Sequence, residues 1–312
     1  MKHRLTRREF VRTAAMAGAA MGGVTLGRRS VAAEAGKVGG STFPSRGRID
    51  SHAHGVSSGS PEVLRAHIAG CRSRGVDRIV LIQSEKTLFD TYARCPEFVV
   101  PVAQVDIDTI KPDEISRLVE RGAKGIKFIG PMHSYGADVY FPLYERLCRL
   151  GVPAVFHTGY LMVGLFEKGG RFYEKPALID ITDMRPAAID RIVRGFPNLK
   201  ILMAHFGNPW WEETWKMIST HRNVYADFSG GTAYRRSMLM WSEMFAPDGK
   251  LDAASAGKLC FGSDAGYFGP DRYPFLDYIA FYERFFDRVG MPADLREKIN
   301  RGNMLELFGL KA

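Results

Sequence analysis

The sequence predicts a single (β/α)₈ TIM barrel, an α/β fold with eight parallel strands inside a ring of helices. Short apolar or β-branched runs alternate with longer stretches of helical periodicity eight times between Arg48 and Leu307. Such alternation is typical of parallel βαβ units, and eight units favour closure into a barrel. The 277 residues after position 35 fit one domain, because single barrels of about 250 residues are common.

The apolar runs give eight predicted strands, and most of the stretches between them have helical periodicity. The strands are predicted at 48–53, 77–83, 98–105, 125–129, 153–157, 200–205, 223–228 and 258–263. Helices are predicted at 61–73, 112–121, 140–150, 186–195, 211–220, 235–245 and 274–289, with a last amphipathic helix over 292–307. The connection near 87–95 has the weakest helical pattern. An open, doubly wound sheet is the alternative, but the first strand ends in D-S-H-A-H rather than in a Gly-rich phosphate loop.

The first 35 residues are predicted to be a signal peptide. Residues 1–12 are strongly basic, 13–26 form a weakly apolar run rich in Ala and Gly, and small residues suitable for cleavage follow. The segment T-R-R-E-F-V-R resembles a twin-arginine export signal, which the Tat machinery reads on proteins exported already folded. The apolar run is too short and Gly-rich for a stable membrane span. We therefore expect a periplasmic or secreted protein, with a linker at 36–46 and the barrel at 47–312.

Charge and cysteine content exclude some other classes of protein. The formal net charge of +9 falls to +4 without residues 1–35, which carry seven Lys/Arg and two acidic residues. No nucleic-acid-binding motif or long basic stripe remains, so no nucleic-acid partner is expected. The four cysteines have no paired spacing, which indicates neither a disulfide framework nor a thiolate zinc site.

Four of the eight histidines lie at the carboxyl ends of predicted strands. His52 and His54 end the first strand, where side chains two residues apart share one face. His157 and His205 end the fifth and sixth strands, and Asp264 follows the eighth. An H-x-H pair alone is equally compatible with a structural role. The full set favours a metal site, because borderline-soft divalent ions select His and Asp ligands at open sites.

These segments resemble a known family. The motifs I-D-S-H-A-H, A-V-F-H-T-G, I-L-M-A-H-F-G, F-G-S-D and the terminal G-N-M-L-E-L-F-G are similar to those of the amidohydrolase superfamily, in its amidohydrolase-related (amidohydrolase 2) branch. That branch contains metal-dependent hydrolases and also non-oxidative decarboxylases related to aminocarboxymuconate-semialdehyde decarboxylase. The resemblance covers nearly the whole chain after residue 46, and it implies a fold and a metal site rather than a substrate.

The resemblance also implies roles for the residues at the strand ends. It makes four side chains the ligands of one divalent ion, expected to be Zn²⁺ with a water in the open position: His52, His54, His157 and Asp264. His205 would be the acid/base, and Asp264 could also accept the proton of the water. Lys127 is ambiguous, because a binuclear subgroup of the superfamily carries a carboxylated lysine on the fourth strand. We expect an ion-paired or substrate-facing lysine, with a binuclear site as the alternative.

Several side chains in the predicted βα loops are candidates for contact with a substrate. They are His133, Tyr160, Trp210, Arg235 and Tyr267. As a set they suggest an aromatic-lined pocket with some positive charge, although each one alone is as compatible with loop packing or a subunit interface. The aromatic stretch 278–286 is predicted to pack in the barrel core. A homodimer contact is the alternative.

Three functions are compatible with this pattern. The first is metal-dependent hydrolysis of an amide, ester or lactone by a metal-activated water, which needs nothing beyond the predicted metal and ligands. The second is metal-dependent, non-oxidative decarboxylation of an unsaturated or aromatic acid, with His205 protonating the carbon. The third is a non-catalytic periplasmic barrel that binds a metal or ligand. We favour the hydrolase, because the sequence contains no decarboxylase-specific signature.

Overall fold

A computed structural model describes residues 47–55, 59–174, 176–230, 233–268 and 273–311. The chain divides into a unit over Met1–Thr42 and a unit over Phe43–Ala312, and the second contains all of the described residues. The predicted signal peptide at 1–35 and the linker at 36–46 therefore lie outside the described residues. Among the described helices, none combines the length and the apolar character that crossing a membrane requires.

The strands form one parallel sheet whose order follows the chain, as the sequence predicted. Their bounds are β1 Arg48–His54, β2 Val76–Gln83, β3 Val99–Val105, β4 Gly125–Phe128, β5 Ala154–His157, β6 Ile201–Ala204, β7 Val224–Asp227, β8 Leu259–Cys260 and β9 Ala265–Gly266. The order is β8-β7-β6-β5-β4-β3-β2-β1-β9. Because β8 and β9 are consecutive in the chain, the sheet closes on itself, and the backbone N–H of Ser51 donates to the carbonyl of Phe261 at 2.8 Å.

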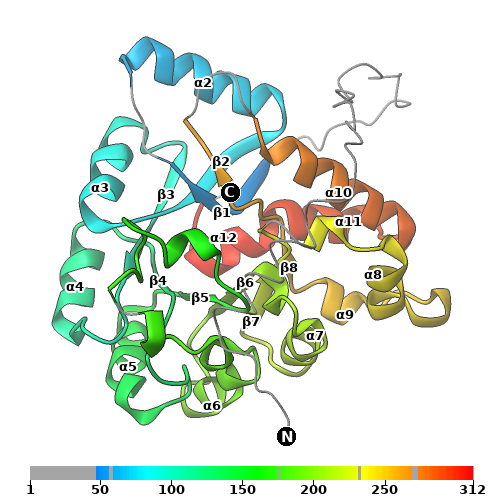
Figure 1. Ribbon diagram of the computed structural model, residues 1–312. Coiled ribbons are helices and arrows are strands. Elements are labelled where there is room, and N and C mark those ends of the chain that lie inside the picture. Colours follow the sequence, from blue (N-terminus) through cyan, green and yellow to red (C-terminus); the bar gives the residue numbers. More distant parts are fainter. Residues whose placement is uncertain (1–46, 56–58, 175, 231–232, 269–272, 312) are drawn as a thin grey trace, which may run out of the picture. The chain divides into compact units, whose positions relative to one another are not determined.

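Helices surround this sheet, and Figure 1 shows α12 inside their ring. Their bounds are α2 Pro61–Ser73, α3 Glu85–Arg94, α4 Pro112–Glu120, α5 Phe141–Leu150, α6 Ala188–Gly195, α7 Trp211–Thr220, α8 Met238–Phe245, α9 Ala253–Ala256, α10 Phe275–Arg288, α11 Ala293–Glu297 and α12 Asn303–Phe308. Local sequence sets their ends: α2 begins after Ser60, whose side chain accepts a hydrogen bond from Val63 N, and has Pro61 in its first turn. The weak pattern near 87–95 is a helix, α3.

Two clusters of apolar side chains fill the domain. The outer one lies between the sheet and the helices, and the inner one fills the barrel. Met304, Leu307 and Phe308 of α12 belong to the inner cluster together with inward-facing strand residues such as Val155 and Leu202. The end of the barrel that α12 covers is thus a packed apolar core. The polar side chains lie at the opposite end, where the strands have their carboxyl ends. The fold prediction is confirmed.

Three predicted elements are wrong in detail. The single eighth strand at 258–263 is two short strands, because the chain leaves strand geometry before Asp264, whose φ is 59°. The sixth strand ends at Ala204 rather than at His205, since His205 adopts a φ of 67° and begins a tight turn. The last helix is α11, a π-helical turn at Lys298–Gly302, and α12.

The aromatic stretch on α10 is part of the core, as predicted. Phe281, Tyr282, Phe285 and Phe286 are completely buried, and Tyr282 donates its hydroxyl proton to the carbonyl of Cys260 at 2.6 Å. These side chains cover the outer face of the last strands and are not a free surface for a second subunit.

Candidate metal centre

The first strand brings two histidines to the mouth of the barrel. Its pairing with β2 has a register irregularity between Asp50 and Ala53. On a regular strand consecutive side chains point to opposite faces, but here Ser51 Oγ lies 2.9 Å from Asp227 Oδ2 and the next residue, His52, has its Nδ1 3.9 Å from the same oxygen. A bulge of this kind re-aims side chains beside functional sites.

The closing strand supplies the carboxylate. The backbone N–H of Asp264 donates to the carbonyl of His52 at 2.8 Å, which fixes the two residues side by side. Asp264 Oδ1 then lies 3.5 Å from His52 Nε2 and 3.0 Å from His54 Nε2. A positive φ outside glycine is uncommon and strained, so the backbone of Asp264 is held in place by this pairing.

The other two histidines extend the cluster from His52. The ring of His205 is 4.8 Å from that of His52, and the ring of His157 is 4.5 Å from that of His205, measured between centroids. Within the part of the chain that the structure describes, three residues offer ligand atoms that all lie within 4.8 Å of one another: His52, His205 and Asp264. His54 contacts this group through Asp264, and His157 contacts it through His205.

Backbone carbonyls fix the orientation of three of the four imidazoles. Ile82 O lies 2.9 Å from His54 Nδ1, Tyr160 O lies 3.2 Å from His157 Nε2, and Ser229 O lies 3.1 Å from His205 Nδ1. A carbonyl can only accept, so each of these nitrogens carries the hydrogen and a neutral ring keeps a lone pair on its other nitrogen. Metal-binding histidines are generally held in this way.

Burial lowers the pKa of three of the four histidines. It lowers the pKa of His52 and of His157 well below the usual range, with nearby Lys127 and neighbouring histidines acting in the same direction. Burial also lowers the pKa of His205. Burial alone would raise the pKa of Asp264, but its contact with His54 and the basic groups of His205 and Lys127 nearby bring it below its usual value. These shifts favour the neutral form of His52, His157 and His205 and the ionised form of Asp264.

Lys127 lies on β4 and is 1 % exposed. Its ammonium nitrogen has no hydrogen-bond partner among the described residues. Burial lowers the pKa of Lys127 to about 7, against the opposing charges of Asp227 and Asp264. Its exposed neighbour Lys124 lies outside the strand. Lys127 is thus a buried amine that faces the metal centre. This position does not distinguish a substrate-facing lysine from a lysine that binds a second metal.

Two buried carboxylates that the sequence analysis missed support the cluster. Asp50 accepts hydrogen bonds from His52 N at 3.0 Å, Ser263 N at 3.0 Å and the Tyr267 hydroxyl at 2.8 Å. Burial raises the pKa of Asp50 to about 7, although these hydrogen bonds act in the opposite direction. Asp227 is completely buried at the end of β7. The available signal was a carboxylate inside a buried strand for Asp50 and a carboxylate at the end of a buried strand for Asp227.

The residues fit a divalent cation. Several imidazoles and one carboxylate within a few ångströms of one another are the donor set that zinc and similar ions bind. His52 Nδ1 is buried without a hydrogen-bond partner, and His54 Nε2 is only 3.0 Å from a carboxylate oxygen. A nitrogen lone pair and a carboxylate oxygen attract each other only when a proton or a cation lies between them, and a divalent ion bound here would meet that need.

A family model described as Amidohydrolase matches residues 72–310. The chain belongs to the amidohydrolase family. The match covers more than half of the sequence and confirms the resemblance carried by the histidine motifs. Members of this family are enzymes, so the third expectation, a non-catalytic barrel, is the least favoured of the three. No curated protein matches this amidohydrolase sequence.

Solved structures share the fold of this amidohydrolase. An uncharacterised TIM-barrel protein from Bordetella bronchiseptica is 18% identical, with a TM-score of 0.59 over 84% of this chain and 98% of that one. A dihydroxybenzoic acid decarboxylase from Polaromonas sp. JS666, with bound manganese and 2-nitroresorcinol, is 16% identical, with a TM-score of 0.55 over 86% and 98%. A probable 2-pyrone-4,6-dicarboxylic acid hydrolase from Acinetobacter baumannii is 14% identical, with a TM-score of 0.54 over 85% and 100%. At these identities the likeness shows the fold alone.

Two of the predicted substrate-side residues form an aromatic wall beside the metal centre of this amidohydrolase. The rings of Tyr160 and Trp210 stack at 5.9 Å with an interplanar angle of 25°. Tyr160 is 58 % exposed, and its carbonyl is the one that contacts His157 Nε2. The guanidinium of Arg185 lies 5.2 Å from the Trp210 ring centroid. An aromatic wall with a cation behind it thus adjoins the histidines.

The other three substrate-side candidates lie elsewhere. Tyr267 is buried, with its hydroxyl on Asp50, so it supports the first strand. Arg235 is exposed, and its Nε contacts the hydroxyl of Tyr234 at 3.2 Å. His133 lines a separate cavity of about 290 Å³ between the loops after β3 and β4, and no residue of the metal centre lines that cavity.

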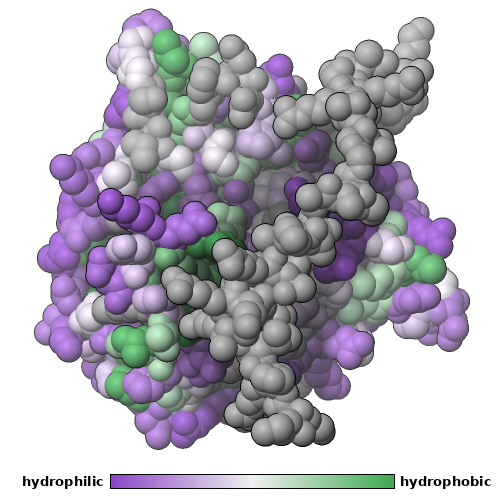
Figure 2. All heavy atoms as spheres, in the orientation of Figure 1, coloured by the Kyte–Doolittle hydropathy of each residue, from purple (hydrophilic) through white to green (hydrophobic). Residues whose placement is uncertain are grey.

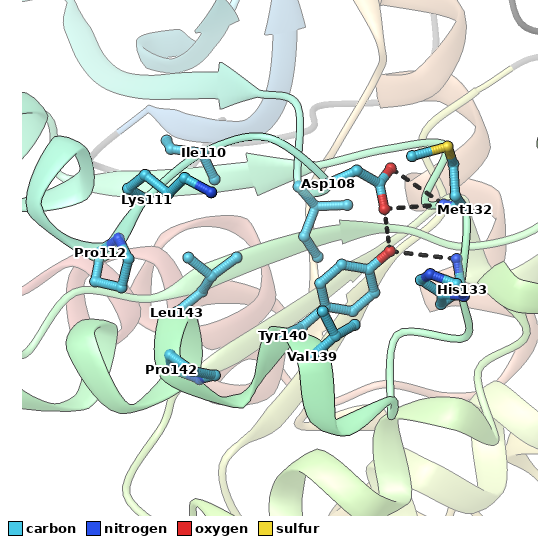
Figure 3. A pocket seen from close by; sticks show the side chains of 11 residues that line it. Asp108, Ile110, Lys111, Pro112, Met132, His133, Val139, Tyr140, Pro142 and Leu143 are labelled. Atoms are coloured by element: carbon cyan, nitrogen blue, oxygen red, sulfur yellow. Dashed lines mark hydrogen bonds between the residues drawn. The ribbon is translucent and has the colours of Figure 1, made fainter.

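Figure 3 shows how the His133 cavity is built. The carboxylate of Asp108 accepts a hydrogen bond from Met132 N at 3.1 Å and another from the hydroxyl of Tyr140. The backbone N–H of His133 donates to that hydroxyl at 3.2 Å. These contacts join the loop after β3 to the loop after β4. They explain the position of the residues around the cavity without a bound substrate.

Polar and charged side chains cover most of the face shown in Figure 2, with smaller apolar areas between them. Among the described residues, the connection between β5 and α6 carries five of the exposed large apolar side chains. They are Tyr160, Met162, Val163, Tyr173 and Leu178. This connection also contributes Tyr160 to the wall beside the metal centre.

Proposed function

We propose that this amidohydrolase is a metal-dependent hydrolase that cleaves an amide, ester or lactone bond of a small, aromatic or carboxylated substrate. The observation that carries the proposal is the cluster in which His52 and His54 face Asp264 while His205 and His157 lie beside them. His52, His54, His157 and Asp264 would hold the ion, and His205 would act as the acid/base. Zn²⁺ is our first choice, because its usual ligands are imidazoles and carboxylates.

The chain's own residues supply the proton transfers. A divalent ion bound here would act as a Lewis acid and make a nearby water more acidic. His205 keeps an unprotonated Nε2 when its Nδ1 donates to Ser229 O at 3.1 Å. That nitrogen can take a proton from the attacking water and return it to the leaving oxygen or nitrogen. Asp264, which faces His52 and His54, is the second group able to accept the proton.

The experiment uses the full chain loaded with zinc and a panel of lactones, esters and amides in ¹⁸O-labelled water. We expect one ¹⁸O atom in the carboxylate of each product molecule. His205→Asn should abolish turnover without loss of metal, whereas His221→Asn, a control on the surface beside Asp190, should not. Metal-loaded protein without turnover of any member of the panel would contradict the proposal.

Decarboxylation of an aromatic acid is the second candidate, and the stack of Tyr160 on Trp210 near Arg185 favours it. A flat aromatic acid could stack on such a wall, next to the ion pair of Arg185 with Glu213. The two reactions differ in their products: release of CO₂ from dihydroxybenzoates without ¹⁸O incorporation would identify the decarboxylase.

We also propose that the protein is exported by the twin-arginine route, as the R-R pair at positions 7 and 8 suggests. The chain would then fold and bind its metal before transport. Replacing both arginines by lysine should keep the full-length precursor inside a bacterial host, while the unchanged sequence appears, shortened, in the periplasm. Equal export of the two forms would contradict the proposal.

A further inference from the structure

A buried pair, Asp227 and Ser229, lies directly beneath His205. Asp227 is completely buried and Ser229 is 1 % exposed. Asp227 Oδ1 accepts the backbone N–H of His205 and that of Ser229, both at 3.0 Å, and the Ser229 hydroxyl also contacts this oxygen. On the other side, Ser51 Oγ lies 2.9 Å from Asp227 Oδ2. Four donors therefore surround this carboxylate, so it serves as an acceptor only.

The positions of the hydrogens follow from this arrangement. Because Asp227 accepts, the hydroxyl hydrogen of Ser229 points toward Asp227, and only lone pairs of Ser229 Oγ remain for other partners. His205 Nδ1 lies 3.0 Å from Ser229 Oγ and 3.1 Å from Ser229 O. Both oxygens act as acceptors toward this nitrogen. The hydrogen of the imidazole must therefore be on Nδ1, and Nε2 carries a lone pair that faces the cluster.

Asp227 also holds the backbone of His205, which determines where its imidazole lies. His205 and Phe206 have φ values of 67° and 48°, a conformation that costs energy in residues other than glycine and persists only where surrounding contacts enforce it. Asp227 enforces it by binding His205 N, and the completely buried Phe206 is enclosed by aromatic rings, 4.8 Å from Phe228 and 5.5 Å from Trp241. Ring and backbone of His205 are thus fixed by neighbouring anchors.

We propose that Ser229, oriented by Asp227, is a positioning residue that holds His205 as the Nδ1–H tautomer, so that His205 enters the reaction as a proton acceptor. The role in catalysis rests on the proposed function, whereas the tautomer does not. In a reaction that begins with proton donation to a carbon, His205 would first need a second proton, so this arrangement favours the hydrolase over the decarboxylase.

The first test measures the tautomer directly. The full chain, labelled with ¹⁵N in its histidine rings and loaded with zinc, is studied by NMR, and a His205→Asn spectrum identifies the His205 signals. We expect Nδ1 protonated and Nε2 unprotonated and free of metal. A protonated Nε2, or an Nε2 bound to zinc, would overturn the proposal. Because no substrate is involved, the answer is independent of the reaction the enzyme performs.

The second test removes the hydroxyl. Ser229→Ala should shift or broaden the His205 ring signals while the other histidines keep theirs, which also verifies that the variant is folded. In turnover assays it should lower kcat about 10- to 100-fold with KM nearly unchanged, as is typical for partners that orient a reactive side chain. Ser242→Ala is the matched control, because this buried serine donates to Leu239 O on α8, away from the cluster. Unchanged His205 signals in Ser229→Ala would overturn the proposal.

The two tests separate the inference from the proposed function. If the tautomer is found as expected but no lactone, ester or amide is turned over, the hydrolase proposal fails and the positioning role stands. If turnover occurs but the tautomer is reversed, the hydrolase stands and the role of Ser229 fails.

Discussion

His54 Nε2 lies 3.0 Å from Asp264 Oδ1, a contact between the first strand and the segment that closes the barrel. The two residues meet because β9 pairs with β1, with Ala53 opposite Ala265. The position of two proposed metal ligands therefore depends on the pairing that closes the sheet.

Metal binding should stabilise the fold and should require the cluster. Zinc at 100 times its dissociation constant stabilises the folded state by about 2.7 kcal/mol, so a chelator should lower Tm and added zinc should restore it. His52→Asn and Asp264→Asn should bind less than one equivalent of zinc and lose this shift in Tm, as measured by elemental analysis and calorimetry. His221→Asn is the control. Full zinc binding by the Asp264→Asn variant would contradict the assigned site.

Lys127 should make the metal-free protein more stable as pH rises. Its pKa is lowered from 10.5 to about 7 by burial, so between these values the unfolded chain binds a proton that the folded chain does not. Stability should therefore increase with pH in this window, with a slope of up to about 1.4 kcal/mol per pH unit. Lys127→Met should remove that slope in urea unfolding at pH 7 and pH 9. Lys124→Met, at an exposed position, should keep it; equal slopes in all three proteins would contradict the buried, neutral amine.

Gly230 leaves room for the ring of His205. Its φ is +84°, and a Cβ placed there would lie 2.8 Å from His205 Nδ1. Gly230→Ala should therefore displace the imidazole and lower kcat, besides a backbone cost of about 1–2 kcal/mol. Gly249→Ala has the same kind of backbone, with a φ of +75°, but nothing within 4 Å of the added atom. It should lose similar stability in thermal unfolding and keep full activity, and equal kcat values for both variants would refute the steric argument.

Trp241 should be a major contributor to the stability of the site's supporting core. It is completely buried and packs 5.5 Å from Phe206 and 4.8 Å from Phe228. Trp241→Ala should cost about 3–5 kcal/mol of unfolding free energy, because it leaves a large cavity. Leu239→Ala on the same helix, at a position that is 52 % exposed, should change stability by no more than about 0.5 kcal/mol. Urea unfolding of both variants measures the difference.

The sequence predicted local structure well where it depends on short-range periodicity. Helices α2 and α7 have the predicted bounds, because apolar spacing and capping residues are local properties. It failed at Asp264 and His205, which have positive φ values that strand periodicity does not predict. Long-range pairing enforces these conformations: Asp264 N binds His52 O, and His205 N binds Asp227.

The sequence by itself determined the barrel, the family, and the placement of the histidines and Asp264 at the strand ends. The physical reason is that the strand pattern and the motifs are local: each depends on residues that are close together in the chain. Only the tertiary structure decided which side chains share the cluster and which nitrogen of each ring points into it. Those properties depend on contacts such as Ser229 with His205 and Tyr160 with His157. They also depend on burial, which sets the pKa of Lys127 and becomes defined only when the sheet closes.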